Sequence, residues 1–523
     1  MQLLPIGIQS FCNLRNDNCV YVDKTEDIYR MITSGRMFFL SRPRRFGKSL
    51  LLSTMEKIFS GNKELFEGLY IYDKWDWTQK YPVIKIDWSG MAHSTVEEME
   101  SGILDFLQSI AAEYQITPST KYAPNCFNDV LKLLHAKTGR QVVVLVDEYD
   151  MPILDALGKP SEVTESIRQF LQSFYKILKS ADEHLRFLFL TGVSKFAKVS
   201  IFSGLNNLYD ITMDASYSTI CGYTQAELES CFGEHIEALA SAEQSTGTDI
   251  IGRIKNWYNG YSWDGITSVY NPFSTLSLFR SKSFDNFWFS SGTPSFLIDL
   301  VKERNDVKPL LEATQMKSSD LNSFDYRTMD VQLLAFQTGY LTVKSSCKID
   351  LDDQLTYTLG IPNEEVRRAL MGHLVSCFAE YPVSRASTMR DRMLHQLLDG
   401  DVTAFENSMR EMFAHIPYQL HIPHEFYYHS LLLCWLNLLG FEVQAEVSTD
   451  KGRIDAVWTW KDKVFVAEIK FAKEGNAATL LKDAFVQIKK NRYYERYQDG
   501  KKHISLLAIA FAGKEIVCKM EEL

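Results

Sequence analysis

The chain has 523 residues, of which 46% are hydrophobic and 23% are charged, as in an ordinary soluble globular protein. This length exceeds what one hydrophobic core usually organises, so roughly two to four domains are expected. Acidic residues (66) outnumber basic residues (56), which gives a net charge of -10. Nonspecific nucleic-acid binding by the whole surface is therefore excluded, and any such contact must come from a local basic patch.

The nine cysteines are scattered along the chain, with no closely spaced pair. An odd count at scattered positions is typical of reduced thiols and predicts neither a zinc site nor a disulfide framework. The first residues lack a basic segment followed by an apolar one, so we expect no signal peptide. The longest apolar run, Leu431 to Leu439, is too short to cross a bilayer. These features predict a cytoplasmic protein without a membrane segment.

Short, mostly apolar segments in the first part of the chain are typical of buried parallel strands. We expect such strands at Met37–Leu40, Val83–Ile86, Val142–Val146 and Phe187–Leu190, and a helix at Leu50–Phe59. Strands that alternate with helices predict an α/β fold with a parallel sheet covered on both faces. Ligands bind such sheets at the carboxyl ends of the strands.

From Cys221 to Pro417 the pattern becomes mostly helical, and we expect a helical lid and connector there. Aromatic-rich loops punctuate this segment at 256–263 (NWYNGYSW), 269–274 (VYNPFS) and 287–296 (FWFSSGTPSF). Aromatic side chains in loops more often pack than form ligand cages, so no ligand site is predicted in them. The changes of pattern predict three domains, at 1–220, 221–417 and 418–523.

The last part of the chain returns to alternating helices and strands. Helices are expected at Glu425–Leu439 and Leu480–Tyr497, and strands at Glu442–Val447, Arg453–Trp460, Val464–Phe471 and Ile504–Phe511. This order predicts a C-terminal α/β domain.

A candidate phosphate-binding loop, SRPRRFGKSL, lies between the first predicted strand and the helix that follows it. Such a loop directs backbone N–H groups and a helix N-terminus at phosphates, with a lysine as a point charge and a serine on Mg²⁺. The usual first glycine is absent, and Arg42 stands in its place. The candidate nucleotide-binding residues of the loop are Arg42, Pro43, Arg44, Arg45, Phe46, Gly47, Lys48 and Ser49.

A second segment, VVVLVDEYD at 142–150, supports a nucleotide site. Asp147 would hold Mg²⁺ together with Ser49, and Glu148 would polarise the attacking water. Thr191, or else Lys195, would sense the terminal phosphate. The alternative is a basic surface turn and a solvated strand end. The order of the segments in an α/β pattern favours the binding of ATP and Mg²⁺.

These segments, together with LTGVSKFAKVSIFSGLNNL at 190–208, resemble the AAA-ATPase-like family of predicted bacterial P-loop ATPases. YVDKT at 21–25 and YNGYSW at 258–263 also match its pattern. The resemblance covers nearly the whole chain, least distinctly at 295–417. It implies an AAA+-type fold for the first part, and members of the family commonly carry a C-terminal nuclease-like domain. An arginine finger from a neighbouring subunit would require a homo-oligomer, which the sequence leaves open.

A second candidate site lies near the C-terminus. Metal-assisted phosphodiester hydrolysis needs carboxylates to hold Mg²⁺ and a lysine to orient water and stabilise charge. Glu468 and Lys470 lie two apart on one predicted strand, so their side chains point to the same face. Asp455 would meet that face if its strand pairs with theirs as a hairpin. Glu425 is a further candidate metal ligand on the preceding helix, and Gln487 lies on the later helix.

This set resembles the PD-(D/E)XK nuclease superfamily, because Glu425, Asp455, Glu468, Lys470 and Gln487 fall at its motif positions in order. No acidic or lysine position is lost, so the resemblance implies a competent catalytic site. The segment Leu480–Lys502 contains seven basic residues interleaved with Tyr493, Tyr494 and Tyr497. It is a candidate contact for a phosphate backbone and for stacked bases, and a solvated helix face is the alternative.

Together these features predict an ATP-binding and ATP-hydrolysing protein whose nucleotide state controls a Mg²⁺-dependent phosphodiesterase (nuclease) domain acting on nucleic acid. DNA is the preferred substrate, although the sequence leaves RNA open. The alternative is a signalling or scaffold ATPase whose C-terminal domain only binds nucleic acid or protein.

Overall fold

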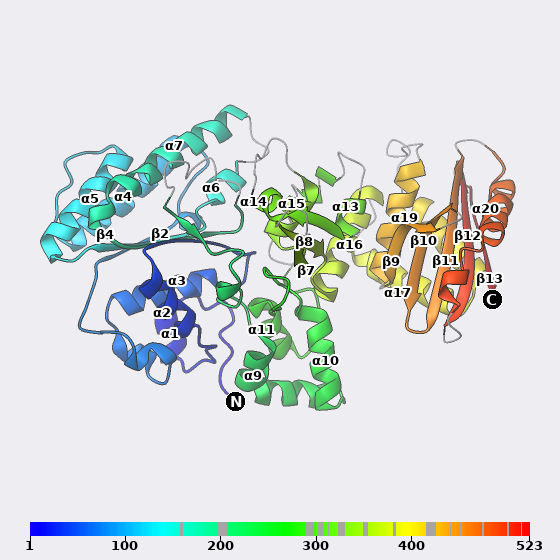
Figure 1. The fold of residues 1–523 in the computed structure, drawn as a ribbon, viewed down its shortest axis with the longest axis horizontal. Helices are drawn as coiled ribbons and strands as arrows, with labels where there is room; N and C mark the ends of the chain where they lie inside the picture. The colour runs from blue at the N-terminus through cyan, green and yellow to red at the C-terminus, as the bar shows by residue number, and fades with distance from the viewer. Residues whose placement is uncertain are drawn as a thin grey trace. The chain divides into compact units, whose positions relative to one another are not determined.

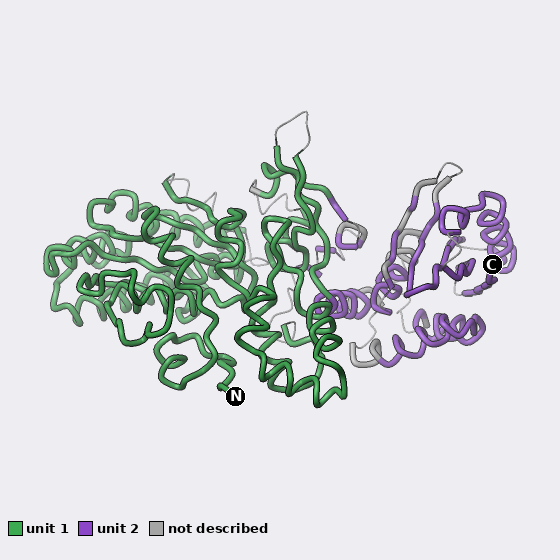
Figure 2. Tube along the Cα trace, turned by 60° about the horizontal axis from the view of Figure 1, so that its bottom comes forward, with its two compact units in different colours: residues 1–291, 315–363 green, residues 292–314, 364–523 purple. Residues whose placement is uncertain are grey.

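The computed structural model describes most of the chain, which forms two compact units (Figure 2). The first unit comprises Met1–Ser291 and Gln315–Asn363, and the second comprises Gly292–Thr314 and Glu364–Leu523. The described residues are 1–156, 161–195, 207–288, 297–298, 300–301, 307–311, 313–322, 330–348, 354–379, 383–414, 425–439, 441–449, 452–472, 475–498, 502–513 and 515–523.

The first unit is built on a five-stranded parallel sheet with the strand order β2-β3-β4-β1-β5. Its strands are β1 (Met37–Ser41), β2 (Val83–Asp87), β3 (Val142–Asp147), β4 (Leu185–Gly192) and β5 (Tyr209–Asp210). Every residue of β1 and β3 is buried, as their unbroken apolar runs predicted. The expected α/β class and parallel sheet are therefore confirmed.

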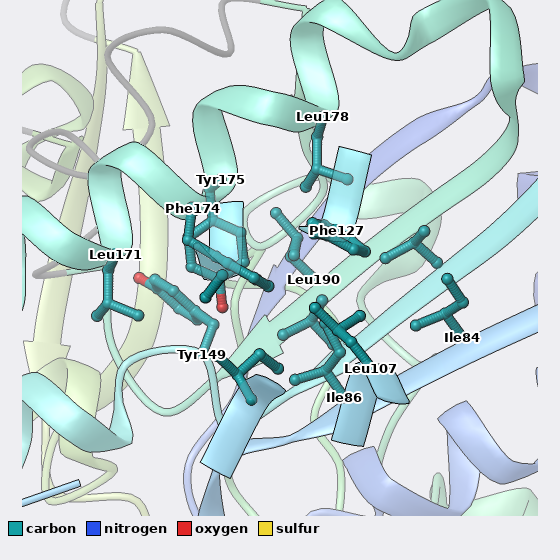
Figure 3. Close-up of a cluster of buried hydrophobic side chains, with 14 of the residues drawn as sticks. Ile84, Ile86, Leu107, Phe127, Tyr149, Leu171, Phe174, Tyr175, Leu178 and Leu190 are labelled. Atoms are coloured by element: carbon teal, nitrogen blue, oxygen red, sulfur yellow. The ribbon is translucent and has the colours of Figure 1, made fainter. Parts of the chain in front are cut away.

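Helices cover both faces of this sheet. Figure 1 shows α4 (Val96–Glu113), α5 (Ala123–Thr138) and α7 (Ser161–Ser180) on one face, and α1 (Phe11–Asn16), α2 (Thr25–Ser34) and α3 (Lys48–Phe59) on the other. Figure 3 shows the core beneath the first group, where Phe127 of α5 and Phe174 of α7 meet Ile84 and Leu190 of the sheet. The rings of Phe127 and Phe174 stack with their centroids 4.8 Å apart. This core fixes the sheet edge at which β2, β3 and β4 end.

The segment expected to be mostly helical contains α9 (Gln225–Ala242), α10 (Gly247–Tyr258), α11 (Pro272–Ser281) and α15 (Val331–Thr338). It also contains the antiparallel strands β7 (Thr342–Lys348) and β8 (Leu355–Gly360), which the sequence did not predict. Their pairing was hidden because β7 exposes most of its side chains and lacks a long apolar run. The three-way division at residues 220 and 417 stays a prediction.

The second unit contains a mixed five-stranded sheet with the order β13-β12-β11-β10-β9. β11 and β12 pair in parallel, and the other neighbours pair antiparallel. The strands are β9 (Glu442–Thr449), β10 (Gly452–Trp460), β11 (Lys463–Ala472), β12 (His503–Ala512) and β13 (Glu515–Glu522). Four of them were expected, and β13 was not. Helix α19 spans Glu425–Leu439 as predicted, whereas α20 (Ala477–Asn491) ends at Arg492, which adopts a left-handed conformation.

Candidate nucleotide and nuclease sites

The phosphate-binding loop joins β1 to α3 at the carboxyl edge of the parallel sheet. Arg45 and Gly47 both have positive φ angles, of 70° and 92°, so the chain turns twice through the left-handed region. A glycine accepts that conformation without a steric penalty, which explains Gly47. Helix α3 begins at the next residue, Lys48, so its free N–H groups follow directly on the loop. The strand–loop–helix context that the mechanism requires is present.

Lys48 lies inside this loop. Its Nζ donates to the carbonyl oxygens of Arg42, at 3.1 Å, and Pro43, at 3.2 Å. The same Nζ lies 3.8 Å from Oε1 of Glu148. The two carbonyl oxygens are neutral and are therefore weaker partners for an ammonium than a phosphate oxygen is. Lys48 is thus placed to exchange them for a nucleotide phosphate.

Two carboxylates end neighbouring strands beside Lys48. Asp147 closes β3 and is in register with Asp87, which closes β2. Burial raises the pKa of Asp147 to about 6, although a hydrogen bond with Ser49 and the charge of Lys48 favour its ionised form. Asp87 was not among the predicted site residues. The signal that could have found it is its place at the end of an apolar strand, as at Asp147.

Glu148 occupies a strained position. Its φ is 50°, in the left-handed region that few non-glycine residues adopt. Its Oε2 is buried and has no hydrogen-bond partner among the described residues. Backbone strain of this kind costs about 1–3 kcal/mol and collects at functional sites. A buried carboxylate oxygen without a protein partner is a candidate acceptor for a hydrogen bond from a bound water or ligand.

Lys48, Asp87 and Glu148 border one cavity of about 380 Å³. A cavity of this size lies within the range of small-molecule and cofactor sites, which is about 300–1,000 Å³. One part of its lining is charged or polar and includes Arg44, Arg45, Lys48, Ser49, Asp87 and Glu148. Another part is apolar and includes Ile8, Pro272 and Phe273. The combination suits a ligand with an anionic end and a less polar end.

Several predicted nucleotide contacts have their side chains engaged elsewhere. The guanidinium of Arg42 is fully buried and donates to backbone carbonyls, and Phe46 is buried among aromatic rings. The Thr191 hydroxyl is also buried and donates to the carbonyl oxygen of Leu40 at 2.8 Å. The alternative phosphate sensor, Lys195, pairs with Asp210 at 3.0 Å. These side chains therefore have partners within the protein, and their roles toward a nucleotide stay predictions.

Asp150 ties the end of β3 to the end of β4. Its buried carboxylate accepts hydrogen bonds from the backbone N–H of Val193 and from both N–H and hydroxyl of Ser194, at 3.2, 2.7 and 2.6 Å. Burial raises the pKa of this carboxyl to about 6. The contact holds the two strand ends in a fixed relation next to Glu148.

In the second unit the predicted hairpin brings the nuclease-type residues together. β10 pairs antiparallel with β11, with Ala456 opposite Ala467. Asp455 and Glu468 are the residues next to this pair on their two strands. The Asp455 carboxylate accepts a hydrogen bond of 2.8 Å from the backbone N–H of Ile469. The Lys470 ammonium lies 2.8 Å from Oε1 of Glu468, whose side chain is 1% exposed against 30% for Lys470. The pair thus joins a buried carboxylate to a partly exposed cation.

The remaining nuclease-type residues lie on helices. Glu425 begins α19, but its side chain lies outside what the structure describes. Gln487 is half-buried on α20. Among the described residues, no group of three or more His, Cys, Asp or Glu side chains could hold a metal ion. Asp455 and Glu468 are the two predicted nuclease-type carboxylates whose side chains the structure describes.

The basic segment around α20 is only partly available for nucleic acid. Lys489 pairs with Glu521 at 2.6 Å, whereas Lys482 and Lys490 are exposed. Tyr493 is buried in the core of the unit, so it packs there and does not offer its ring to a base.

The eight cysteines that the structure describes all carry free thiols. Across the same residues, no helix combines the length and apolar character needed to cross a bilayer.

A parallel sheet with a phosphate-binding loop, followed by a mixed sheet carrying Asp455, Glu468 and Lys470, defines a P-loop protein with a nuclease-type domain. Residues 5–202 match the family model described as "Predicted AAA-ATPase", and residues 423–521 match that of the PD-(D/E)XK nuclease superfamily. The chain belongs to this predicted AAA-ATPase family, with a C-terminal domain of the PD-(D/E)XK nuclease superfamily. Both resemblances seen in the sequence are thereby confirmed.

A relative matches almost the whole chain. It is a protein of Azotobacter chroococcum mcd 1, described as "Uncharacterized protein in vnfD 5'region". The two are 38% identical over 517 residues, which span 97% of this chain and 96% of that protein. No solved structure gave a significant match.

Proposed function

We propose that the first unit binds ATP with Mg²⁺ and hydrolyses it. The observation that carries the proposal is the convergence of Lys48, Ser49, Asp87 and Glu148 on one cavity at the carboxyl edge of the sheet. Asp147, which is buried, and Asp87, which is half-buried, end their strands in register, so their carboxylates repel each other and favour a cation between or beside them. The donor set therefore fits a hard divalent cation such as Mg²⁺, which prefers oxygen ligands.

Each residue then has a distinct part in the reaction. Ser49 and Asp147 would hold Mg²⁺, which when bound supplies positive charge to the phosphates. Lys48 would leave the carbonyls of Arg42 and Pro43 to bind a phosphate, and Arg44 and Arg45 would add positive charge at the same cavity. Glu148 would accept a hydrogen bond from the attacking water and orient it toward the terminal phosphate.

For the second unit we propose Mg²⁺-dependent hydrolysis of a phosphodiester, with nucleic acid as the substrate and DNA preferred. Asp455 and Glu468 would hold the cation, with Glu425 as a further ligand. Lys470 would orient the attacking water and stabilise the charge that develops on the phosphate. The support is the hairpin register and the 2.8 Å contact between Lys470 and Glu468. Gln487 would support the site from α20.

We further propose that the nucleotide state of the first unit controls cleavage by the second. The proposal is supported by the pairing of the two domains in one chain and in a relative that matches 97% of it. The competing function, an ATPase whose C-terminal domain only binds nucleic acid or protein, differs in one respect. It predicts ATP turnover without cleavage of any substrate.

The test is cleavage of labelled linear and circular DNA and RNA with Mg²⁺, with and without ATP. Wild type is compared with Lys48→Ala, Lys470→Ala and a control, Lys519→Ala, which removes an exposed lysine of β13. We expect Lys470→Ala to lose cleavage but keep ATP turnover, and Lys48→Ala to lose the effect of ATP. Cleavage that survives in Lys470→Ala would reject the assigned site. ATP turnover without cleavage in wild type would favour the binding-only alternative.

A further inference from the structure

Residues of the three aromatic-rich loops contact the phosphate-binding loop. We name this set the aromatic collar and define it as Tyr261, Trp263, Phe273 and Trp288. All four lie far from the loop in sequence but belong to the same compact unit. From sequence alone these loops predicted packing, and the structure shows what they pack against.

The collar contacts four residues of the loop, Arg42, Arg44, Arg45 and Phe46. The Trp263 ring lies 3.8 Å from Cζ of Arg42, and the Phe273 ring lies 4.3 Å from Cζ of Arg45. Trp288 donates from Nε1 to the Arg44 carbonyl oxygen at 3.1 Å. The buried Phe46 ring packs edge-on against Tyr261 and Trp263, with centroids 4.8 and 5.5 Å apart. A Cβ at Gly339 would come within 2.7 Å of Pro43, so the loop is also enclosed there.

Arg42 is the residue that this enclosure explains best. Its guanidinium donates from Nη1 to the carbonyl oxygens of Ser41 and Thr212, both at 2.9 Å, and from Nη2 to that of Tyr217 at 3.2 Å. A buried charge is costly unless it is hydrogen-bonded. The face of an indole supplies further attraction, which is stronger when the cation is desolvated. Three backbone carbonyl oxygens and the Trp263 ring thus hold the Arg42 guanidinium in one position.

The position of Arg42 affects the nucleotide site through the backbone of the loop. The carbonyl oxygens of Arg42 and Pro43 are the groups that hold the Lys48 ammonium. A loop without its first glycine has fewer backbone conformations of its own to choose from, and Pro43 restricts φ further. The side-chain contacts of the loop then act together with these backbone restrictions to set its shape. Trp263 packs against Arg42, the residue that replaces the usual first glycine.

We propose that Trp263 and Arg42 form a positioning pair, which sets the shape of the phosphate-binding loop and hence its affinity for a nucleoside triphosphate. This inference rests on the proposed nucleotide site. It adds Trp263 to the residues that shape the site and gives Arg42 a role that needs no contact with the nucleotide. Because coupling between a ligand and a contact is reciprocal, bound nucleotide should in turn stabilise the packing of Trp263.

The test measures ATP affinity, by titration with a fluorescent ATP analogue, and KM and kcat for hydrolysis. The variants are Trp263→Ala, Trp263→Phe and Arg42→Lys. The control is Trp77→Ala, which removes a half-buried tryptophan of the same unit that packs on Phe66. All are compared well below their melting temperatures, so that lower stability alone leaves the affinity unchanged.

We expect Trp263→Ala to weaken ATP binding and raise KM about tenfold, which corresponds to about 1.4 kcal/mol, with a much smaller change in kcat. Trp263→Phe keeps a ring beside Arg42 and should recover most of the affinity. Arg42→Lys keeps the charge but loses the planar fork, so it should resemble Trp263→Ala. Arg42→Lys serves as the test variant if Trp263→Ala does not fold. Trp77→Ala should bind ATP like wild type.

The outcomes separate this inference from the function on which it rests. If wild type binds no nucleotide, the proposed nucleotide site is wrong. If wild type binds ATP, and Trp263→Ala and Arg42→Lys bind it equally well, the positioning pair is rejected while the site stands. An equal loss of affinity in Trp77→Ala would also reject it, because the effect would then be general.

Discussion

At the scale of single residues, Asp147 shows how a site can be held at the expense of stability. Its carboxyl is nearly fully buried beside Asp87 and Glu148, and burial raises its pKa to about 6 from its ordinary value of 3.8. The folded chain therefore binds more protons than the unfolded chain between these values. Stability of the metal-free protein should fall as the pH rises through this window, and the loss should persist at neutral pH.

We therefore expect Asp147→Asn to stabilise the metal-free first unit at pH 7.5, by about 1–3 kcal/mol, since one pKa unit corresponds to about 1.4 kcal/mol. The gain should shrink as the pH is lowered toward 4, because the wild-type carboxyl is then protonated. Thermal melts in a chelator at several pH values measure it. A destabilised variant at pH 7.5 would show that the contact with Ser49 outweighs burial.

Glu148 should affect turnover rather than binding. Its buried Oε2 lacks a protein partner among the described residues, and the proposed role needs a carboxylate to accept a proton or a hydrogen bond from water. Glu148→Gln should bind ATP as tightly as wild type and hydrolyse it about 100-fold more slowly, the lower end of general-base effects. The control is Glu183→Gln, whose side chain is exposed. Unchanged hydrolysis would remove Glu148 from the mechanism.

At the scale of elements, the ends of β3 and β4 form one tightly packed junction. A Cβ at Gly192 would lie 2.2 Å from Oδ1 of Asp150 and 2.6 Å from the Tyr149 ring. Glycine is therefore required there for close approach and not for its conformational freedom.

Gly192→Ala should destabilise the first unit by about 2–3 kcal/mol, in the range of overpacked cores. It should also lower ATP turnover, because Asp150 would move with Glu148 two residues away. Gly90→Ala is the matched control, since a Cβ there meets no atom within 4 Å. Denaturant unfolding monitors both variants. Equal stability of the two would mean that the junction can relax around a methyl group.

The elements that could be predicted from sequence are those whose signal is local. β1, β3 and β4 are continuous apolar runs between polar ends, and the loop reads as a phosphate-binding loop from Gly47 to Ser49. β13 was missed because it alternates charged residues with buried ones at an edge of the sheet.

The site was harder to predict than the fold, because its geometry depends on contacts between distant segments. No local pattern reveals that Arg42 is buried under Trp263, or that Asp87 stands in register with Asp147. In contrast, the hairpin of β10 and β11 was predictable, since two short strands joined by a tight turn pair in one register.

At the scale of the whole molecule, the chain divides into two compact units. The separate buried clusters of the two α/β sheets mean that each sheet has a hydrophobic core of its own. Molecules with more than one such unit commonly unfold in more than one step.

Calorimetry should accordingly show two thermal transitions, and ATP with Mg²⁺ should raise only one of them. At about 100 times the dissociation constant, the stabilisation expected from linkage is about 2.7 kcal/mol. Lys48→Ala should abolish this shift and leave the second transition in place. A single transition in wild type would show that the units unfold together, and an equal shift in Lys48→Ala would place ATP elsewhere.

The contact between Arg42 and Trp263 also has a consequence for how such sequences diverge. A glycine at the start of a phosphate-binding loop can persist by itself, whereas an arginine in its place depends on an indole supplied by a segment distant in the sequence. Substitution of either residue alone would leave a buried cation without its ring, or a ring over an empty space. Relatives are therefore expected to keep the two together or to replace both, and a lineage that regains the glycine is released from keeping the tryptophan.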